Sequence, residues 1–157
     1  EFVPQALANT AWAFAKAGHE APALFEAIAQ EAQGRVREFS ALDLKTMAWA
    51  FAMAGHKAPA LFEAIAQQAQ SRVGQFGKHH LTDTAWAFAL TGHEAPALFE
   101  AIAREAQGRI EREAQGRVGE FVPQGLSNTA WAFATAGHEA PALFEAIAKQ
   151  AQGRVGE

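Results

Sequence analysis

One stretch of this chain occurs four times, and this repetition limits the folds open to it. Each copy has an alanine-rich segment around one tryptophan, a Gly-His pair, and then a segment that begins with proline. The tryptophans are 37, 37 and 45 residues apart in sequence. Periods of this length are typical of helical-hairpin arrays. The units that follow from this spacing are residues 2–38, 39–75, 76–120 and 121–157.

The third unit is eight residues longer than the others because Arg-Glu-Ala-Gln-Gly-Arg occurs in it twice, at 104–109 and 112–117. An apolar residue recurs every four positions from Ile102 to Val118, across the insertion near 104–118. One interpretation is that the second helix of this unit runs about 12 Å further. The other is a break at Gly108, which would change the angle between units three and four.

Each unit predicts two helices that fold back on each other. The first runs from about Pro4 to Ala17, and proline suits a first helical position. In the second unit, Ser40 and Asp43 have the spacing of a capping box. Glycine ends each first helix, and the alanine before each later proline is disfavoured in helical geometry. The glycines are Gly18, Gly55, Gly92 and Gly137, and the prolines are Pro22, Pro59, Pro96 and Pro141.

The apolar pattern differs between the two helices. The second has the stripe of a half-buried helix, from Leu24 to Val36. The first has an apolar arc roughly 200° wide, more than one neighbour can cover. A helix between its own partner and the next repeat would need such an arc. We therefore predict an all-α fold, in which residues 1–157 form one right-handed α-solenoid of four helix-turn-helix repeats, about 37 residues each and eight helices in all.

Composition excludes several classes of protein. There is no cysteine, which removes disulfides and thiolate metal sites, and the net charge of −4 argues against coating nucleic acid by charge alone. No apolar run approaches the length of a membrane span, so we expect no membrane insertion. Both ends fall on a repeat boundary and there is no initiator Met. We expect a segment of a longer array or of a larger assembly.

No catalytic arrangement is present: the sequence has no Gly-rich phosphate loop and no Ser/His/Asp set. We expect no enzyme activity, no cofactor and no small-molecule substrate. One histidine after each first helix gives no ligand pair, and His79 and His80 would point about 100° apart on a helix, so we expect no metal. Those four histidines, His19, His56, His93 and His138, suit the negative end of the helix dipole.

The copies differ mainly along one face of the first helix. Variable positions at offsets of 0, 4 and 11 residues lie within about 40° of each other on a helix. The centre of this face carries Ala13, Ala50, Ala87 and Ala132. Drift of a solvated face is one interpretation, but drift would favour Glu, Lys and Arg. Asn, Gln, Thr, Asp and His are types that read base edges or peptide groups. The predicted recognition face consists of Gln5, Asn9, Lys16, Thr46, Met53, His79, Asp83, Leu90, Gln124, Asn128 and Thr135.

The charges and the tryptophans bear on the same face. The first-helix segments sum to +1 and the remainder of the chain to −5, so binding to RNA would be modest and strongly salt-dependent. Burial in the seam between repeats and base stacking are both open for Trp12, Trp49, Trp86 and Trp131. Dipole compensation and phosphate contact are both open for Arg35, Arg72, Arg117 and Arg154, which are expected to end the second helices.

The frame Asn9-Thr-Ala-Trp-Ala-Phe-Ala15, with Leu7 before it and a Pro-led second helix after it, resembles the octotricopeptide repeat family in all four units. That resemblance implies an RNA-binding α-solenoid whose first helices line the concave surface. It implies a role in chloroplast or mitochondrial RNA maturation, stability or translation. It would also place Asn9, Thr46, Asp83 and Asn128 towards the bound strand.

Two functions therefore stay open. One is a modular solenoid that binds single-stranded RNA with about one nucleotide per unit. The other is a protein-interaction or structural solenoid, a subunit of a larger organellar complex whose groove holds a protein partner. The Asn, Asp and Thr side chains and the resemblance favour the first, and the acidic balance favours the second.

Overall fold

The structure is a computed structural model that describes residues 3–114 and 123–154. Within these ranges the chain forms eight α-helices and no strand, which confirms the all-α prediction. The first helices of the four units are α1 (Pro4–Ala17), α3 (Ala41–Ala54), α5 (Lys78–Thr91) and α7 (Pro123–Ala136). The second helices are α2 (Pro22–Gln33), α4 (Pro59–Ser71), α6 (Pro96–Ala114) and α8 (Pro141–Arg154).

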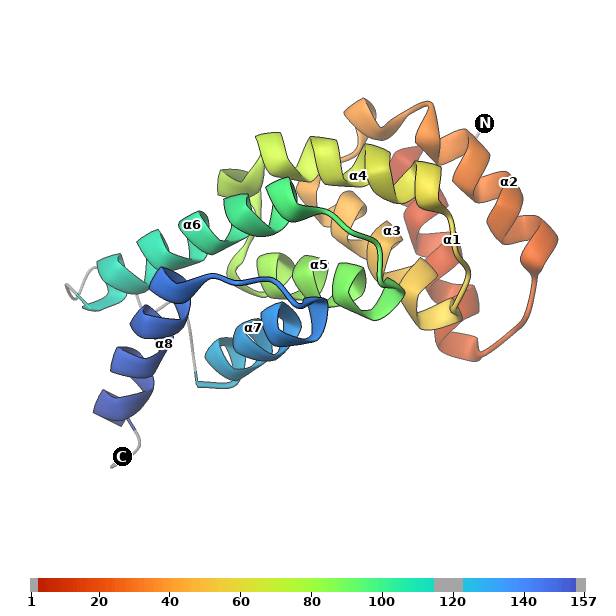
Figure 1. Ribbon diagram of the computed structural model, residues 1–157. Helices are drawn as coiled ribbons and strands as arrows, with labels where there is room; N and C mark the ends of the chain where they lie inside the picture. The colour runs from red at the N-terminus through yellow and green to blue at the C-terminus, as the bar shows by residue number, and fades with distance from the viewer. Residues whose placement is uncertain (1–2, 115–122, 155–157) are drawn as a thin grey trace.

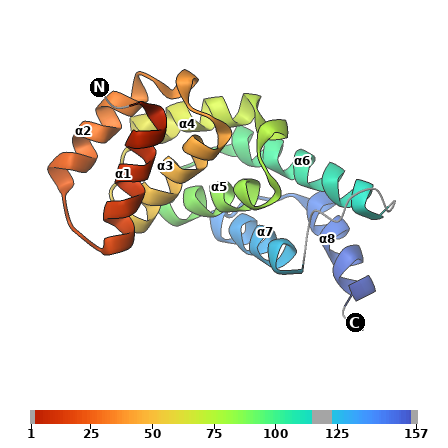
Figure 2. The ribbon, with the colours of Figure 1, turned by 180° about the vertical axis from the view of Figure 1, so that it is seen from behind.

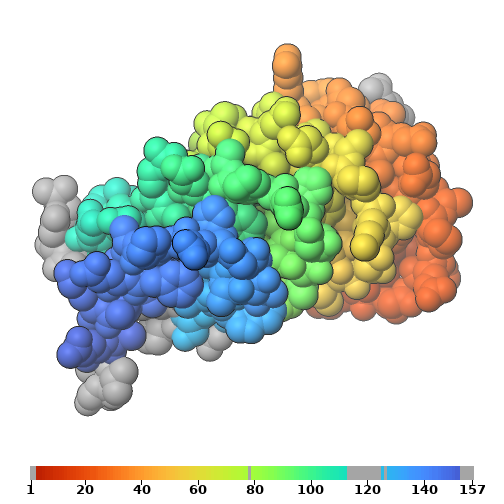
Figure 3. All heavy atoms as spheres, in the orientation of Figure 1, coloured from red at the N-terminus to blue at the C-terminus, as the bar shows by residue number. Residues whose placement is uncertain are grey.

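The helices form two layers. The helices α1, α3, α5 and α7 lie side by side in one layer, and α2, α4, α6 and α8 lie in the other (Figures 1 and 2). Each helix packs against the equivalent helix of the next unit as well as against its hairpin partner. The units follow one another across the surface in chain order (Figure 3). This is the helical-hairpin solenoid that the repeat predicts.

The predicted helix boundaries are largely confirmed. The backbone N–H of Asp43 donates to Ser40 Oγ at 3.1 Å, and the Ser40 N–H donates to Asp43 Oδ2 at 3.3 Å, which completes the capping box. Gly18 and Gly55 end their helices at φ +67°, a conformation that favours glycine. Each second helix begins at its predicted proline. Local sequence signals therefore define the hairpins.

The predicted end of the second helix is wrong in the first two units but confirmed in the fourth, where α8 ends at Arg154. Helices α2 and α4 end at Gln33 and Ser71, so Arg35 and Arg72 lie beyond them. Both arginines have φ −128°, outside helical geometry, and each is followed by a 3₁₀ turn: η1 (Val36–Glu38) or η2 (Val73–Gln75). These turns bring Phe39 and Phe76 into the core. Burial of these phenylalanines outweighs continuation of the helix.

The insertion lengthens a helix. Helix α6 has 19 residues and runs through Gly108, whereas α2 has 12. Extension is therefore confirmed as far as Ala114, and a break at Gly108 is wrong. Gly116, Arg117 and Val118 lie outside the described residues, as does the side chain of Arg154.

Phenylalanines join successive units. The ring centroids of Phe25 in α2 and Phe51 in α3 are 5.0 Å apart, with the rings edge to face. Equivalent phenylalanine pairs join α4 to α5, with tilted rings 5.0 Å apart, and α6 to α7, with edge-to-face rings 5.1 Å apart. Every seam thus has an aromatic pair from a second helix and the following first helix, which buries apolar surface that one unit could not bury alone.

Candidate functional site

The candidate site is the face of α1, α3, α5 and α7 that points away from the second layer. We call it the open face. In α1 it carries Gln5, Asn9, Trp12 and Lys16, which lie within about 60° of each other on the helix. Leu7 lies on the opposite side of α1 and is buried. The open face is therefore formed by the same positions in all four units.

Most of the predicted recognition residues are exposed on this face. The exposed ones are Gln5, Asn9, Lys16, Met53, His79, Leu90, Asn128 and Thr135. Thr46 and Asp83 are half-buried, and the side chain of Gln124 lies outside the described residues. The described members of the predicted set thus lie along one surface. That they contact a ligand stays a prediction.

Asp83 has a structural partner that the sequence did not suggest. Its Oδ2 is 3.8 Å from the Nζ of Lys45, so an ion pair joins α5 to α3. His80 lies in the same cluster, and burial, followed by the charge of Lys45, lowers its pKa from the usual 6.5. One sequence signal could have indicated this ion pair: Lys45 occupies a position where the other units have the uncharged residues Ala8, Thr82 and Ser127. The pair partly neutralises a lysine near the open face.

The alanines that were expected at the centre of the face are mostly elsewhere. Ala50, Ala87 and Ala132 are completely buried. They lie about 100° around the helix from the tryptophans, where adjacent first helices meet. Ala13, in the first unit, is exposed. The prediction is wrong for the three buried alanines because a small side chain there allows close helix packing.

The tryptophans form a stack along the open face. The ring centroids of Trp49 and Trp86 are 4.8 Å apart at 34°, and those of Trp86 and Trp131 are 5.3 Å apart at 31°. Trp49 and Trp86 are half-buried against the core, whereas Trp12 and Trp131 are 40% and 47% exposed. The rings therefore pack in the seams and also reach the surface. Whether they stack on bases stays a prediction.

The open face is also unusually apolar. Among the described residues, six large hydrophobic side chains are exposed, and all except Val3 lie on this face. The five are Trp12, Leu42, Met53, Leu90 and Trp131. Exposed apolar side chains are ordinarily scattered, and a contiguous group of them marks an interaction site. Leu42 occupies the variable position of Gln5 in the first unit, but it was not included in the predicted recognition face.

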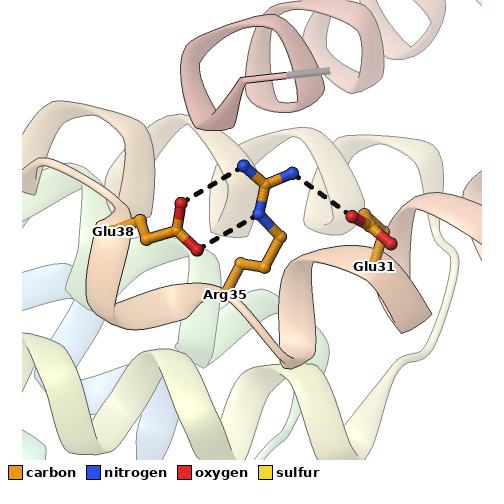
Figure 4. Close-up of polar contacts among 3 residues, drawn as sticks. All are labelled: Glu31, Arg35 and Glu38. Atoms are coloured by element: carbon orange, nitrogen blue, oxygen red, sulfur yellow. Dashed lines mark hydrogen bonds and ion pairs between the residues drawn. The ribbon is translucent and has the colours of Figure 1, made fainter. Parts of the chain in front are cut away.

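Two of the described arginines bind backbone carbonyl groups, a role that the sequence did not suggest. Arg72 Nη1 donates to the carbonyl oxygen of Phe39 at 2.7 Å, and Arg109 Nη2 donates to that of Phe76 at 2.6 Å. Arg109, 37 residues after Arg72, occupies the place that had been assigned to Arg117. It is 6% exposed, so its guanidinium is turned into the protein and away from solvent. Figure 4 shows Arg35 of the first unit between Glu31 and Glu38.

The histidines after the first helices also join units. The rings of Phe25 and His56 are stacked with centroids 5.7 Å apart, and His56 Nε2 is 3.7 Å from Glu26 Oε2. His93 and Glu63 repeat this pairing at 3.5 Å. In the described part of the chain, no group of three or more metal-ligating side chains is gathered, and no helix has the length and apolar character to cross a membrane.

A comparison with protein families assigns most of the chain to a family. A family model described as RNA-editing substrate-binding complex 6 protein matches residues 1–112. The chain belongs to this family. The matched region includes the first two repeats and most of the third, and with them six of the eight helices to within two residues. No curated protein matches the sequence. The match supports an RNA-related helical protein and does not point to the octotricopeptide family.

Proposed function

We propose that this chain binds single-stranded RNA along its open face, as a subunit of an RNA-editing substrate-binding complex in the mitochondrion. The family description names such a complex. The observation that carries the proposal is the open face itself, where a tryptophan recurs in every unit and exposed amide side chains lie beside it in the first and fourth units. A chloroplast location, the other half of the earlier expectation, has no support and is not proposed.

Aromatic and amide side chains together suit unpaired bases. Every base has a π face that stacks on an aromatic ring. The edges of a base accept hydrogen bonds from Asn and Gln side chains and donate hydrogen bonds to them. Trp12 and Asn9 are both exposed on α1, and Trp131 and Asn128 on α7. The step from one unit to the next would allow about one nucleotide per unit, as in other helical repeats that bind RNA.

Charge favours contact through bases over contact through phosphates. The chain has a net charge of −4, and Lys45 is paired with Asp83. Lys16 is exposed, with its Nζ 4.9 Å from the centre of the Trp12 ring. A face with few cations gains little from counterion release. Stacking and hydrogen bonding must then supply most of the affinity.

A protein partner is the second candidate. Leu42, Met53 and Leu90 are exposed on the open face and would suit the apolar side of a helix. A subunit of a complex needs such a surface. Binding of RNA to the isolated chain, with residues of the open face setting its preference, distinguishes the two functions.

The experiment measures binding of the whole chain to random-sequence, single-stranded RNA and then selects the preferred sequences. Exchanging Asn9, Thr46, Asp83 and Asn128 among the types found in the other units should alter the preferred sequence. Asn9→Thr and Asn128→Thr are the cleanest changes because both residues are exposed. The melting temperature of these two variants should change little, as expected for surface substitutions.

Gln30→Thr is the matched control, because Gln30 is exposed on α2 in the other layer. It should leave the selected sequence unchanged. The proposal is wrong if exchanges on the open face and on α2 have the same effect on sequence preference. Loss of folding after Asn9→Thr would also contradict it, since that would place Asn9 in the core.

A further inference from the structure

Successive tryptophans are in ring contact at two of the three steps between units, which we call closed, and not in contact at the third, which we call open. Trp49 contacts Trp86, and Trp86 contacts Trp131, at centroid distances of 4.8 Å and 5.3 Å. Trp12 and Trp49, both within the described residues, make no such ring contact. A pocket of about 300 Å³ lies between them instead, lined by Trp12, Ala15, Lys16, Trp49, Ala50 and Met53.

The open step differs chemically from the closed ones. Lys16 lies beside it, with its Nζ 4.9 Å from the centre of the Trp12 ring, a cation–π contact. The equivalent residues in the next two units, Met53 and Leu90, are uncharged. No carboxylate lines the pocket. The first seam therefore combines two separated indoles with a cation, and the later seams do not.

The shape and lining of the pocket define what it can hold. Its walls include two indole rings, and Ala15 and Ala50 add little side-chain volume between them. Its volume is at the lower end of the range for pockets that bind small molecules. A planar aromatic group could contact both indoles, and an anion attached to it could reach the ammonium of Lys16. A nucleobase in a polynucleotide has both features, because it is flat on two sides and is followed by a phosphate.

We infer that the gap between Trp12 and Trp49 receives one nucleobase of a single-stranded RNA, stacked between the two indoles, with its phosphate close to Lys16. This inference rests on the proposed function and adds a defined insertion site to it. The inserted base continues the tryptophan stack at the one step where protein rings do not meet. At the two closed steps, the facing sides of the rings are already occupied by each other, so insertion there would require their separation.

The test compares two oligonucleotides of equal length, one single-stranded RNA and one abasic ribose-phosphate chain, by fluorescence anisotropy with the whole chain. Stacking one base is commonly worth about tenfold or more in affinity. Trp12→Leu keeps an apolar side chain but removes the ring, so it should weaken binding of the RNA about tenfold. It should leave binding of the abasic chain unchanged. Trp12→Phe keeps a ring and should restore most of the affinity.

We expect the Trp12 variants to fold as the wild type does, because Trp12 is 40% exposed. The melting temperature of each variant is measured beside the affinity. Lys16→Gln is the second variant, and it should weaken binding of both oligonucleotides because it removes a phosphate contact rather than a stacking surface.

Each outcome has a defined meaning. RNA binding that is equal for wild type and Trp12→Leu overturns the insertion site and leaves the proposed function standing. An equal loss with the abasic chain also overturns it, because the ring would then not act on a base. Absence of RNA binding by the wild type overturns the proposed function and this inference together. Trp12-dependent binding of an acidic peptide with one phenylalanine, without RNA binding, would assign the pocket to a protein partner.

Discussion

Arg109 donates a hydrogen bond of 2.6 Å to the carbonyl oxygen of Phe76, at the other end of the same unit. Arg72 makes the same contact with Phe39 at 2.7 Å. Both carbonyls lie in linkers where a 3₁₀ turn has replaced the helix, so α-helical hydrogen bonds cannot satisfy them. These arginines therefore tie the end of a unit to the linker at its beginning.

Substitution of Arg109 should destabilise the chain. Arg109→Met keeps the apolar stem but leaves the carbonyl of Phe76 and the carboxylate of Glu105 without their donor. We expect a loss of about 2 kcal/mol, or roughly 5 °C in melting temperature. Thermal unfolding followed by circular dichroism measures it.

Arg104→Met is the matched control. Arg104 lies on the same helix and pairs with Glu100, but its side chain is 74% exposed. Exposed pairs contribute little, so its effect should stay below about 0.5 kcal/mol. Equal effects of the two substitutions would show that the contact with Phe76 does not stabilise the fold.

The second unit lacks the carboxylate that pairs with this arginine in the first and third units, so its stability can be improved. Arg35 and Arg109 pair with Glu31 and Glu105, four residues before them, whereas Arg72 has Gln68 at that position. Among the described residues, Nε and Nη2 of Arg72 are buried without a hydrogen-bond partner. Gln68→Glu should supply the partner and stabilise the chain by about 1 kcal/mol.

The control for this change is Gln67→Glu, which adds the same charge one residue earlier at an exposed position. It should leave the melting temperature almost unmoved. If Gln68→Glu fails to raise the melting temperature above that of Gln67→Glu, the unpaired guanidinium atoms of Arg72 are not a source of instability.

Much of the fold follows from local signals in the sequence. Proline at the start of helices, the Ser40–Asp43 capping box and glycine at Gly18 and Gly55 each act through a few neighbouring atoms, so the hairpins could be predicted. The 3₁₀ turns could not be predicted in this way. They accompany the burial of Phe39 and Phe76 in the core, which depends on tertiary packing that no local pattern encodes.

His80 should make stability depend on pH. Burial, with the charge of Lys45 added to it, lowers its pKa below 6.5 in the folded chain. The unfolded chain therefore binds this proton more readily, and stability is lost as the pH falls below about 6.5. His80→Gln should reduce the fall in melting temperature between about pH 7 and about pH 5.

His79→Gln provides the comparison, because His79 is the exposed neighbour of His80 on α5. We expect this variant to lose stability on acidification as the wild type does. A fall in melting temperature that is the same in both variants would show that the protonation of His80 is not coupled to folding.

Lys16 should account for a measurable part of the salt dependence of RNA binding. For single strands, each phosphate contact adds about −0.7 to the slope of log affinity against log salt. Lys16→Gln should make the slope shallower by about that amount and weaken binding at low salt. Lys149 lies on α8 in the other layer, and its side chain is 76% exposed. Lys149→Gln should therefore change neither the slope nor the affinity at low salt. Equal slopes for Lys16→Gln and wild type would exclude a phosphate contact at Lys16.

The candidate site could be predicted in position but not in detail. The variable positions Asn9, Lys16 and Asn128 are exposed on the open face, because helix geometry alone decides which residues share a side. The ion pair of Asp83 with Lys45 and the buried alanines depend on how adjacent first helices pack. Contacts between units join residues far apart in sequence, and no periodicity shows which side chains meet there.

The measurement that tests the central claim most directly is titration of labelled random-sequence RNA with the 157-residue chain across about 50 to 200 mM salt. Single-stranded DNA and double-stranded RNA serve as competitors. The account predicts saturable binding of single-stranded RNA at low salt, which weakens as salt rises and is reduced by Trp12→Leu. Absence of binding to single-stranded RNA at the lowest salt would contradict it.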